Sequence, residues 1–172
     1  MIERRSSHDH KEGCVFCELP DERRIDLGVS SFYGSYDAFP LNPGHMEIIP
    51  IRHVDRLLDL TKKERGELFE AVENGIEVTR NTDLRVIYQK GLENPVNEES
   101  VWFLQQALNN PNINVPAADY TFGVNDGPFA GRTIDHLHWH TIPRYEGDVT
   151  DPRGGIRYVI PDLANYKIPR GK

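Results

Sequence analysis

The segment DHLHWHTIPR, residues 135–144, carries histidines at three alternate positions, His136, His138 and His140. On an α-helix, side chains two and four positions apart point in different directions, because the helical repeat is 3.6 residues. On a β-strand, alternate side chains share one face. The leucine and tryptophan between the histidines would then face the other way, toward a core. The spacing therefore predicts a strand with one apolar face and one face of imidazoles.

Three histidines on a straight strand do not easily share one metal ion. Each two-residue step is about 6.6 Å, so His136 and His140 would lie roughly 13 Å apart at the backbone. A zinc–nitrogen bond is only about 2.0–2.1 Å long. At least one histidine is then left for other chemistry. Ordinary surface histidines are the alternative, but the strict alternation and the apolar backing favour a functional site.

Length and composition indicate one globular domain. The chain has 172 residues, of which 38% are hydrophobic and 27% charged. Its formal charge of -7 argues against a general nucleic-acid binder but is compatible with a small anionic ligand. No apolar run approaches the roughly 20 residues of a membrane span. The polar beginning of the chain lacks a secretory signal, so we expect a cytoplasmic protein without membrane contact.

Helical periodicity is strongest behind the sequence TKKE, where Thr61 and Glu64 form a capping-box pattern. Apolar residues then recur at helical spacing, which predicts a long helix over residues 62–79. A shorter helix is predicted for NEESVWFLQQAL, residues 97–108, which is followed by NNPN. The surrounding residues 81–118 are rich in Asn and Pro, so we expect a loop-rich insertion there.

Short strands are expected at residues 32–36, 46–51 and 120–124, separated by turns that contain proline and glycine. Together with the histidine strand they predict an α+β fold, in which one long and one shorter helix pack on an antiparallel sheet. Residues 1–12 are expected to be a flexible arm, and residues 13–172 a single domain.

These features resemble the histidine-triad (HIT) family, whose signature is His-x-His-x-His followed by apolar positions. The resemblance covers four further segments: CVFC at 14–17, NPGHMEIIPIRH at 42–53, VNDGPFAGRTIDH at 124–136, and PRYEGDV with DPRGGIR at 143–157. Bacterial hydrolases of diadenosine polyphosphates are similar in these respects. The chain departs from the family pattern at Arg132, where glutamine is usual, and over residues 85–118, which are longer than in compact relatives.

The resemblance implies a HIT-like fold and a nucleotide hydrolase or transferase that acts at an α-phosphate. It makes His138 the nucleophile that forms a nucleotidyl-imidazole intermediate, with His140 and His45 beside the phosphate and His136 completing the catalytic set. A neutral imidazole with a pKa near 6.5 is available at pH 7 without an activating base. A backbone carbonyl on the second ring nitrogen would hold the required tautomer.

The resemblance also implies a substrate-binding set. The turn at residues 125–133 would contact the phosphate through Asn125, Gly131, Arg132 and Thr133, by backbone and side-chain donors. Asp37 would bind the ribose hydroxyls. The sequence leaves two alternatives open, because Asp37 also suits a turn-capping role and Arg132 also suits a plain surface position.

A zinc site is the third implication of the resemblance. A lone CxxC pair, Cys14 and Cys17, is weak evidence for metal, and two packed thiols are an ordinary alternative. With His53 and His136 the pair completes the Cys2His2 set that bacterial relatives use for structural zinc. His138 and His140 would then remain available for catalysis.

Several functions stay open. The leading hypothesis is a hydrolase that cleaves dinucleoside polyphosphates or adenylylated compounds; a phosphorylase would differ only in using phosphate as the acceptor. A non-catalytic nucleotide-binding regulator could use the same pocket. A metal-centred hydrolase ranks last, because the sequence reveals no convincing carboxylate ligand. The resemblance also implies a homodimer, with the tail at residues 153–166 approaching the partner's pocket.

Overall fold

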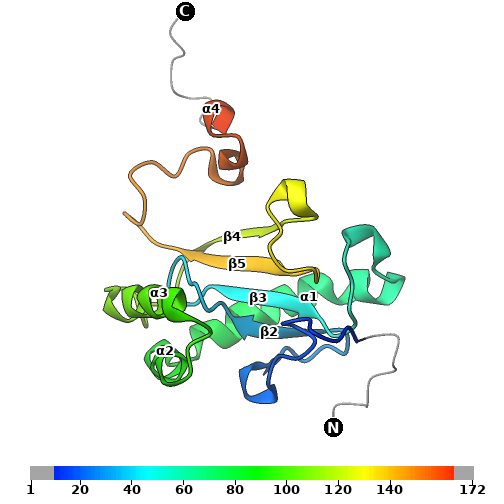
Figure 1. The fold of residues 1–172 in the computed structure, drawn as a ribbon. Helices are drawn as coiled ribbons and strands as arrows, with labels where there is room; N and C mark the ends of the chain where they lie inside the picture. Colours follow the sequence, from blue (N-terminus) through cyan, green and yellow to red (C-terminus); the bar gives the residue numbers. More distant parts are fainter. Residues whose placement is uncertain (1–9, 165–172) are drawn as a thin grey trace, which may run out of the picture.

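The computed structural model describes residues 10–164, in which five strands form an antiparallel sheet of order β1-β2-β3-β5-β4 (Figure 1). The expected arm over residues 1–12 thus lies largely outside the described residues. The strands are β1 (Ile25–Asp26), β2 (Phe32–Tyr36), β3 (Met46–Pro50), β4 (Asp119–Val124) and β5 (Trp139–Arg144). The α-helices are α1 (Lys62–Arg80), α2 (Leu84–Glu93), α3 (Glu98–Asn109) and α4 (Pro161–Ala164). Short 3-10 turns are η1 (Asp21–Arg23), η2 (Leu57–Asp59), η3 (Pro128–Ala130) and η4 (Gly155–Val159).

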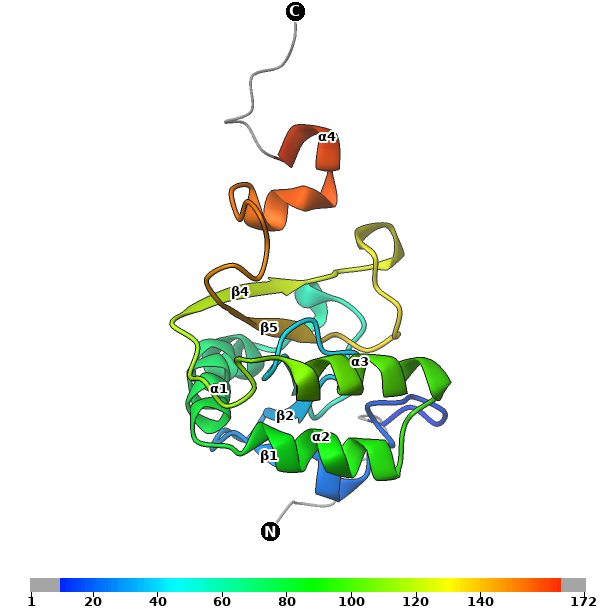
Figure 2. The same ribbon diagram turned by 90° about the vertical axis from the view of Figure 1, so that its left-hand side faces the viewer.

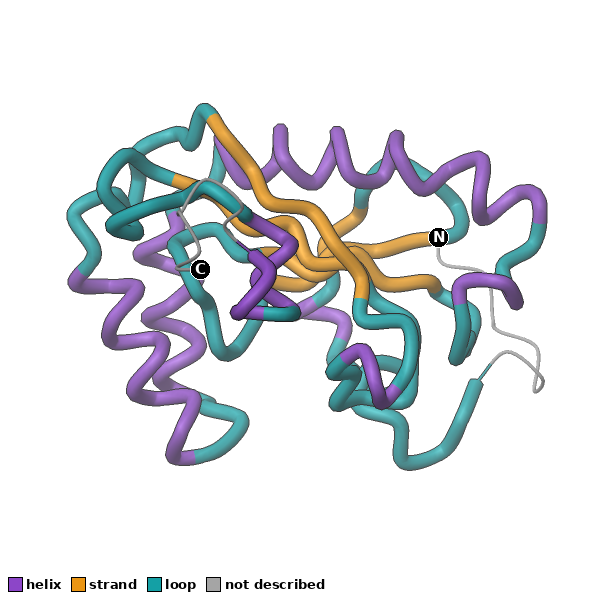
Figure 3. The backbone as a smooth tube through the Cα atoms, turned by 90° about the horizontal axis from the view of Figure 1, so that it is seen from above, coloured by secondary structure: helices purple, strands orange, loops and turns teal. Residues whose placement is uncertain are grey.

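Helix α1 begins at the expected capping box and covers one face of the sheet (Figure 3). The Thr61 hydroxyl accepts the Glu64 N–H at 3.2 Å, and the Glu64 carboxylate accepts the Thr61 N–H at 2.6 Å. Gly75 has a packing role in this helix, since an added Cβ would come within 3.0 Å of Ile48 Cδ1. The glycine therefore permits a close approach of helix and sheet, which compensates for its low helix propensity.

Helices α2 and α3 lie side by side, next to the β1–β2 side of the sheet (Figure 2). Helix α3 confirms the prediction of a shorter helix, whereas α2 is a correction, because its residues were expected to be part of a loop-rich insertion. Only Leu84 and Tyr88 of α2 are buried. Both belong to the same core as Leu104 and Ala107 of α3, so tertiary packing stabilises a helix whose periodicity in the sequence is weak.

The histidine segment enters the sheet later than expected, since β5 begins at Trp139 and contains only His140 of the three histidines. The ladder between β3 and β5 ends at the Ile48–Trp139 pair. Pro50 has no N–H to offer the next pair, so the strand cannot extend further toward His136. The alternation nevertheless holds in the extended chain, because Leu137 and Trp139 lie in the core that faces α1.

The C-terminal segment with η4 and α4 projects beyond the β4 edge of the sheet (Figure 1), and η4 contacts β4. Up to residue 164, the segment that follows β5 contains only these two short helical elements. Across residues 10–164, none of the helices combines the length and the apolar character required to cross a bilayer.

Candidate functional site

His138 is fixed in one tautomer by its own backbone. Its Nδ1–H donates to the carbonyl oxygen of His136 at 2.7 Å, which leaves Nε2 with a lone pair. The side chain is buried, and its ring packs edge-on against Phe16 with centroids 5.0 Å apart. A neutral imidazole held in this way is competent as a nucleophile.

His140, His45 and Asp37 form a chain of contacts beside His138. The rings of His138 and His140 have centroids 5.1 Å apart, and His140 Nδ1 lies 3.1 Å from His45 Nε2. His45 Nδ1 in turn lies 3.3 Å from Asp37 Oδ2. The two ring nitrogens of His45 thus face different partners, so these contacts form a polar relay from His140 to Asp37. The sequence did not reveal that a carboxylate stands at its end.

Burial keeps the three imidazoles neutral. It is the main cause that lowers the pKa of His138, His140 and His45 below the ordinary value of 6.5. The Asp37 carboxylate opposes this effect at all three rings by favouring their charged forms. Proton transfer along the relay therefore starts from neutral rings at pH 7.

Asp37 has the turn-capping role, one of the two that the sequence left open, and it also lies beside the histidines. Its Oδ1 accepts the Phe39 N–H at 2.8 Å, which is the turn-capping contact. Its Oδ2 remains directed at His45, and lies 4.0 Å from His140 Nδ1. The turn that follows delivers His45 through Gly44, which has φ +86° and whose N–H donates to the Tyr88 hydroxyl at 2.7 Å. Through this hydrogen bond α2, which is not part of the histidine motif, supports the turn that carries His45.

The phosphate-side turn contains a buried arginine. Gly127 carbonyl accepts the Arg132 N–H at 3.1 Å, and Gly131 has φ +93°, which suits glycine. The Arg132 guanidinium donates to the Asp55 carbonyl and to Asp135 Oδ1. Arg132 is therefore not a plain surface residue, because its side chain is only 8% exposed and ties this turn to the loop after β3.

The other members of the expected phosphate-binding set are placed differently. Asn125 is half-buried and its backbone carbonyl accepts the Gly127 N–H at 2.9 Å, whereas Thr133 is exposed. Both belong to the loop that connects β4 to the histidine segment. Their contacts with a phosphate stay a prediction.

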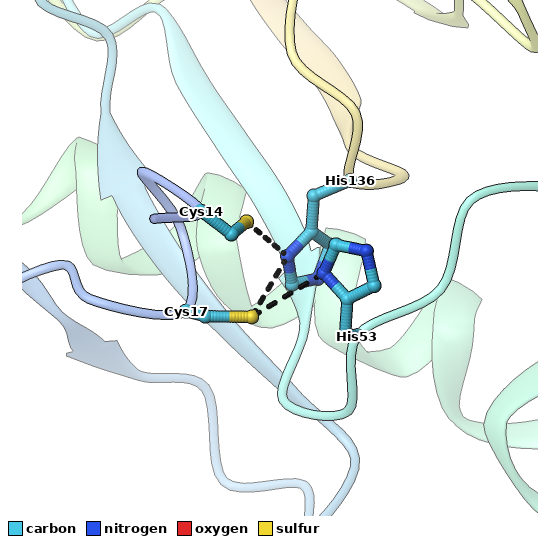
Figure 4. Close-up of side chains that lie close together, drawn as sticks. All are labelled: Cys14, Cys17, His53 and His136. Atoms are coloured by element: carbon cyan, nitrogen blue, oxygen red, sulfur yellow. Dashed lines mark hydrogen bonds between the residues drawn. The ribbon is translucent and has the colours of Figure 1, made fainter. Parts of the chain in front are cut away.

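Cys14, Cys17, His53 and His136 converge on one point from three separate parts of the chain (Figure 4). The potential ligand atoms all lie within 4.8 Å of one another. His136 Nδ1 is 3.4 Å from Cys14 Sγ, and His53 Nδ1 is 3.3 Å from Cys17 Sγ. A tetrahedral zinc with two sulfur and two nitrogen ligands separates its ligand atoms by about 3.5 Å. The donor set and its size therefore fit zinc.

The second nitrogen of each histidine in this cluster is also held. His136 Nε2 lies 3.0 Å from the Pro50 carbonyl oxygen, and His53 Nε2 lies 3.1 Å from Asp55 Oδ1. Such outer partners orient metal-binding imidazoles. Both nitrogens of His136 are thus occupied in a fully buried ring, which favours the metal role over the direct catalytic role that was also expected of it.

Two residues near the site were missed from the sequence. Phe16, between the cysteines, packs against the rings of both His136 and His138. Glu47 is a buried acid in the middle of β3. A charged residue inside the otherwise apolar run MEIIPI was the signal that could have identified it.

Comparisons with known proteins agree with this geometry. A family model described as HIT domain matches residues 30–147. AP-4-A phosphorylase of Mycobacterium tuberculosis is 28% identical over 155 residues, which cover 86% of this chain and 63% of that protein. The asymmetrical bis(5'-nucleosyl)-tetraphosphatase of Schizosaccharomyces pombe is 30% identical over 112 residues, covering 65% and 44%. The chain thus spans less than two thirds of the length of either relative.

The fold is shared with solved structures. Plasmodium falciparum diadenosine triphosphate hydrolase has a TM-score of 0.53 and 20% identity, with 86% of this chain and 76% of that chain covered. A HIT family member from Bacillus subtilis has a TM-score of 0.54 and 19% identity, with coverage of 80% and 77%.

Proposed function

The chain belongs to the histidine-triad family, and from this premise we propose that it cleaves dinucleoside polyphosphates or adenylylated compounds at the α-phosphate through a covalent intermediate on His138. The observation that carries the proposal is the hydrogen bond from His138 Nδ1–H to the His136 carbonyl, next to the relay of His140, His45 and Asp37. This combination provides a fixed nucleophile and an adjacent proton carrier.

In the first step His138 Nε2 attacks the α-phosphorus. A P–N bond forms while the P–O bond to the leaving group breaks, and the leaving oxygen takes the electron pair. His140 and His45, when protonated, stabilise the charge on the phosphate or protonate the leaving group. Asp37 favours these cations, as its effect on both pKa values indicates. We assign the ribose hydroxyls to the same carboxylate.

In the second step an acceptor oxygen attacks the phosphorus and the P–N bond breaks, which returns the lone pair to Nε2. With water as acceptor the protein is a hydrolase, and the acceptor proton passes to the relay or to solvent. With inorganic phosphate it is a phosphorylase, an alternative that the similarity to AP-4-A phosphorylase supports. Arg132, Asn125, Gly131 and Thr133 are the proposed phosphate contacts.

Covalent trapping tests the proposal. Purified protein is mixed with labelled diadenosine tetraphosphate, quenched in alkali, in which nucleotidyl-histidine survives, and mapped by peptide mass. We expect the label on His138, and an activity loss of at least about a thousandfold in His138→Asn. His10→Asn is the control, because His10 is exposed. Label on another residue, or a His138→Asn enzyme as active as the control, would refute the nucleophile.

Product analysis distinguishes a hydrolase, a phosphorylase and a regulator that only binds nucleotide. Mass spectrometry with and without inorganic phosphate distinguishes AMP with ATP, expected from hydrolysis, from ADP with ATP, expected from phosphorolysis. A regulator that only binds nucleotide would show saturable binding without either pair of products.

We also propose that Cys14, Cys17, His53 and His136 hold a structural zinc ion. Zinc would join the N-terminal segment, the loop after β3 and the histidine segment. Cys14 and Cys17 are free thiols, which are usual in reducing compartments, and this supports a cytoplasmic location. We expect about one zinc per chain by elemental analysis, and none in Cys17→Ser. Tetrahedral thiolate absorption after cobalt substitution gives a readout independent of activity. Metal-free wild-type protein with unchanged thermal stability would contradict the proposal.

A homodimer is the proposed assembly. The described part of the expected tail exposes Ile156, Val159 and Ile160, with 60%, 74% and 55% of their surface accessible. Apolar residues gathered on a projecting segment suit burial against a second copy. Sedimentation at micromolar concentration should give a dimer, and Ile160→Asp a monomer. A wild-type monomer would contradict it.

A further inference from the structure

Glu47 is a buried acid on β3, the central strand of the sheet. Only 9% of its surface is exposed. Within residues 10–164 its carboxyl accepts no hydrogen bond and forms no ion pair. A carboxyl in this position is unfavourable for the fold, because it loses its hydration and gains no compensating contact.

The register places Glu47 on the histidine-bearing face. It lies opposite His140 on β5 and opposite Ser35 on β2. Cross-strand partners project to the same side of a sheet and touch one another. The carboxyl is therefore one strand away from the relay.

A cavity of about 460 Å³ lies between the β1–β2 side of the sheet and α2. Its wall includes Ser35, the cross-strand neighbour of Glu47. It also includes Arg23 and Asp37, the two charged residues that act electrostatically on the Glu47 carboxyl. Cavities that bind small molecules commonly have volumes of this order.

The proposed function fixes which part of a nucleotide reaches this cavity. With the α-phosphate at His138 and the ribose at Asp37, the nucleobase extends past Asp37 toward Ser35. Burial, aided by Asp37, raises the pKa of Glu47, so that the neutral acid is favoured. A neutral carboxylic acid offers one donor and one acceptor side by side.

We infer that Glu47 determines base specificity by hydrogen-bonding the polar edge of an adenine. On its N7 edge adenine presents the N7 acceptor next to the N6 amino donor, which complements a carboxylic acid. Guanine presents two acceptors, N7 and O6, on the same edge and leaves the Glu47 carbonyl oxygen opposed by another oxygen. The inference rests on the proposed function, because the phosphate and ribose positions orient the base.

Titration calorimetry with AMP and GMP tests the inference without turnover. Wild-type protein should bind AMP at least about tenfold more tightly than GMP, the discrimination expected of one paired edge. Glu47→Gln keeps a donor and an acceptor in the same shape and should keep the preference. Glu47→Leu fills similar space without polar atoms and should reduce the ratio to about threefold or less. Glu99→Gln, at an exposed position of α3, is the matched control.

The outcomes separate the two proposals. Wild-type protein that binds neither nucleotide contradicts the proposed function. Wild-type binding without preference for AMP, or a preference that survives in Glu47→Leu, overturns the role of Glu47. A preference lost equally in Glu47→Gln overturns the paired edge, since the amide also offers one donor beside one acceptor. Thermal unfolding of each variant confirms that it is folded.

Discussion

Replacing Tyr88 with phenylalanine tests whether α2 supports the turn that carries His45. The Tyr88 hydroxyl accepts the Gly44 N–H at 2.7 Å, and the residue is 1% exposed. Removal of the oxygen leaves a buried donor unpaired, which lowers the free energy of unfolding by about 1–3 kcal/mol. In a domain of this size 1 kcal/mol corresponds to about 2–4 °C, so the melting temperature should fall by about 2–12 °C.

Calorimetry and urea unfolding at pH 7 measure this change. Tyr158→Phe is the control, because Tyr158 is 46% exposed and its hydroxyl makes no hydrogen bond among residues 10–164. Its stability should stay within about 0.5 kcal/mol of the wild-type value. Since Gly44 directly precedes His45, Tyr88→Phe should also reduce turnover more than it weakens nucleotide binding. A Tyr88→Phe protein as stable and active as the control would refute the supporting role of α2.

Three further predictions concern stability. Leu137→Ala should lower the free energy of unfolding by about 2–5 kcal/mol, measured by urea denaturation, because a fully buried side chain leaves a cavity behind the histidines. Thr61→Ala should lower it by about 1 kcal/mol, measured by calorimetry, because the α1 cap is lost. Stability should also decrease as the pH falls below about 6.5, because the folded state resists protonation of His45 and His140 while the unfolded chain takes up the protons. Urea midpoints at pH 7.5 and 5.5 test this, and equal midpoints would contradict it.

The sequence predicts those elements whose local signals agree with their packing. The strand at residues 32–36 and the helix behind Thr61 are found where they were expected, because turn residues and a capping box mark their limits. Helix α2 has no such advantage. Its two buried residues give only a weak helical periodicity. The helix is stabilised by packing against α3 and by the Gly44 hydrogen bond, and these tertiary contacts cannot be read from the local sequence.

In the site, too, some residues could be predicted from local sequence and others only from tertiary contacts. The histidine spacing and the CxxC pair identify side chains by type, and the structure brings them together as the resemblance implied. The position of Arg132 could not be predicted, since its partner Asp55 becomes a neighbour only when the loop after β3 folds against the turn. Glu47 was not predicted as a site residue, because a single acid in a short strand is usually solvent-exposed. Here the residue lies on a central strand that pairs with β2 on one side and β5 on the other.

The alternation of the three histidines joins the Cys2His2 cluster to the proposed nucleophile His138 through a single residue, His136. The His136 ring lies among Cys14, Cys17 and His53, while the His136 carbonyl accepts the Nδ1–H of His138. The contacts that hold the His136 ring also help to hold the His136 carbonyl, and this carbonyl selects the tautomer of His138. The cluster can therefore influence the chemistry without contacting the substrate.

Loss of a cluster ligand should accordingly appear at His138. In Cys14→Ser, nitrogen NMR of the imidazoles should show His138 distributed between both tautomers, whereas in the wild-type protein Nδ1 carries the proton. A variant that stays folded should then lose turnover while it retains nucleotide affinity, because the proposed phosphate and ribose contacts lie elsewhere. If His138 keeps one tautomer in a folded Cys14→Ser protein, the His136 carbonyl is held by the backbone alone, and the two sites are independent.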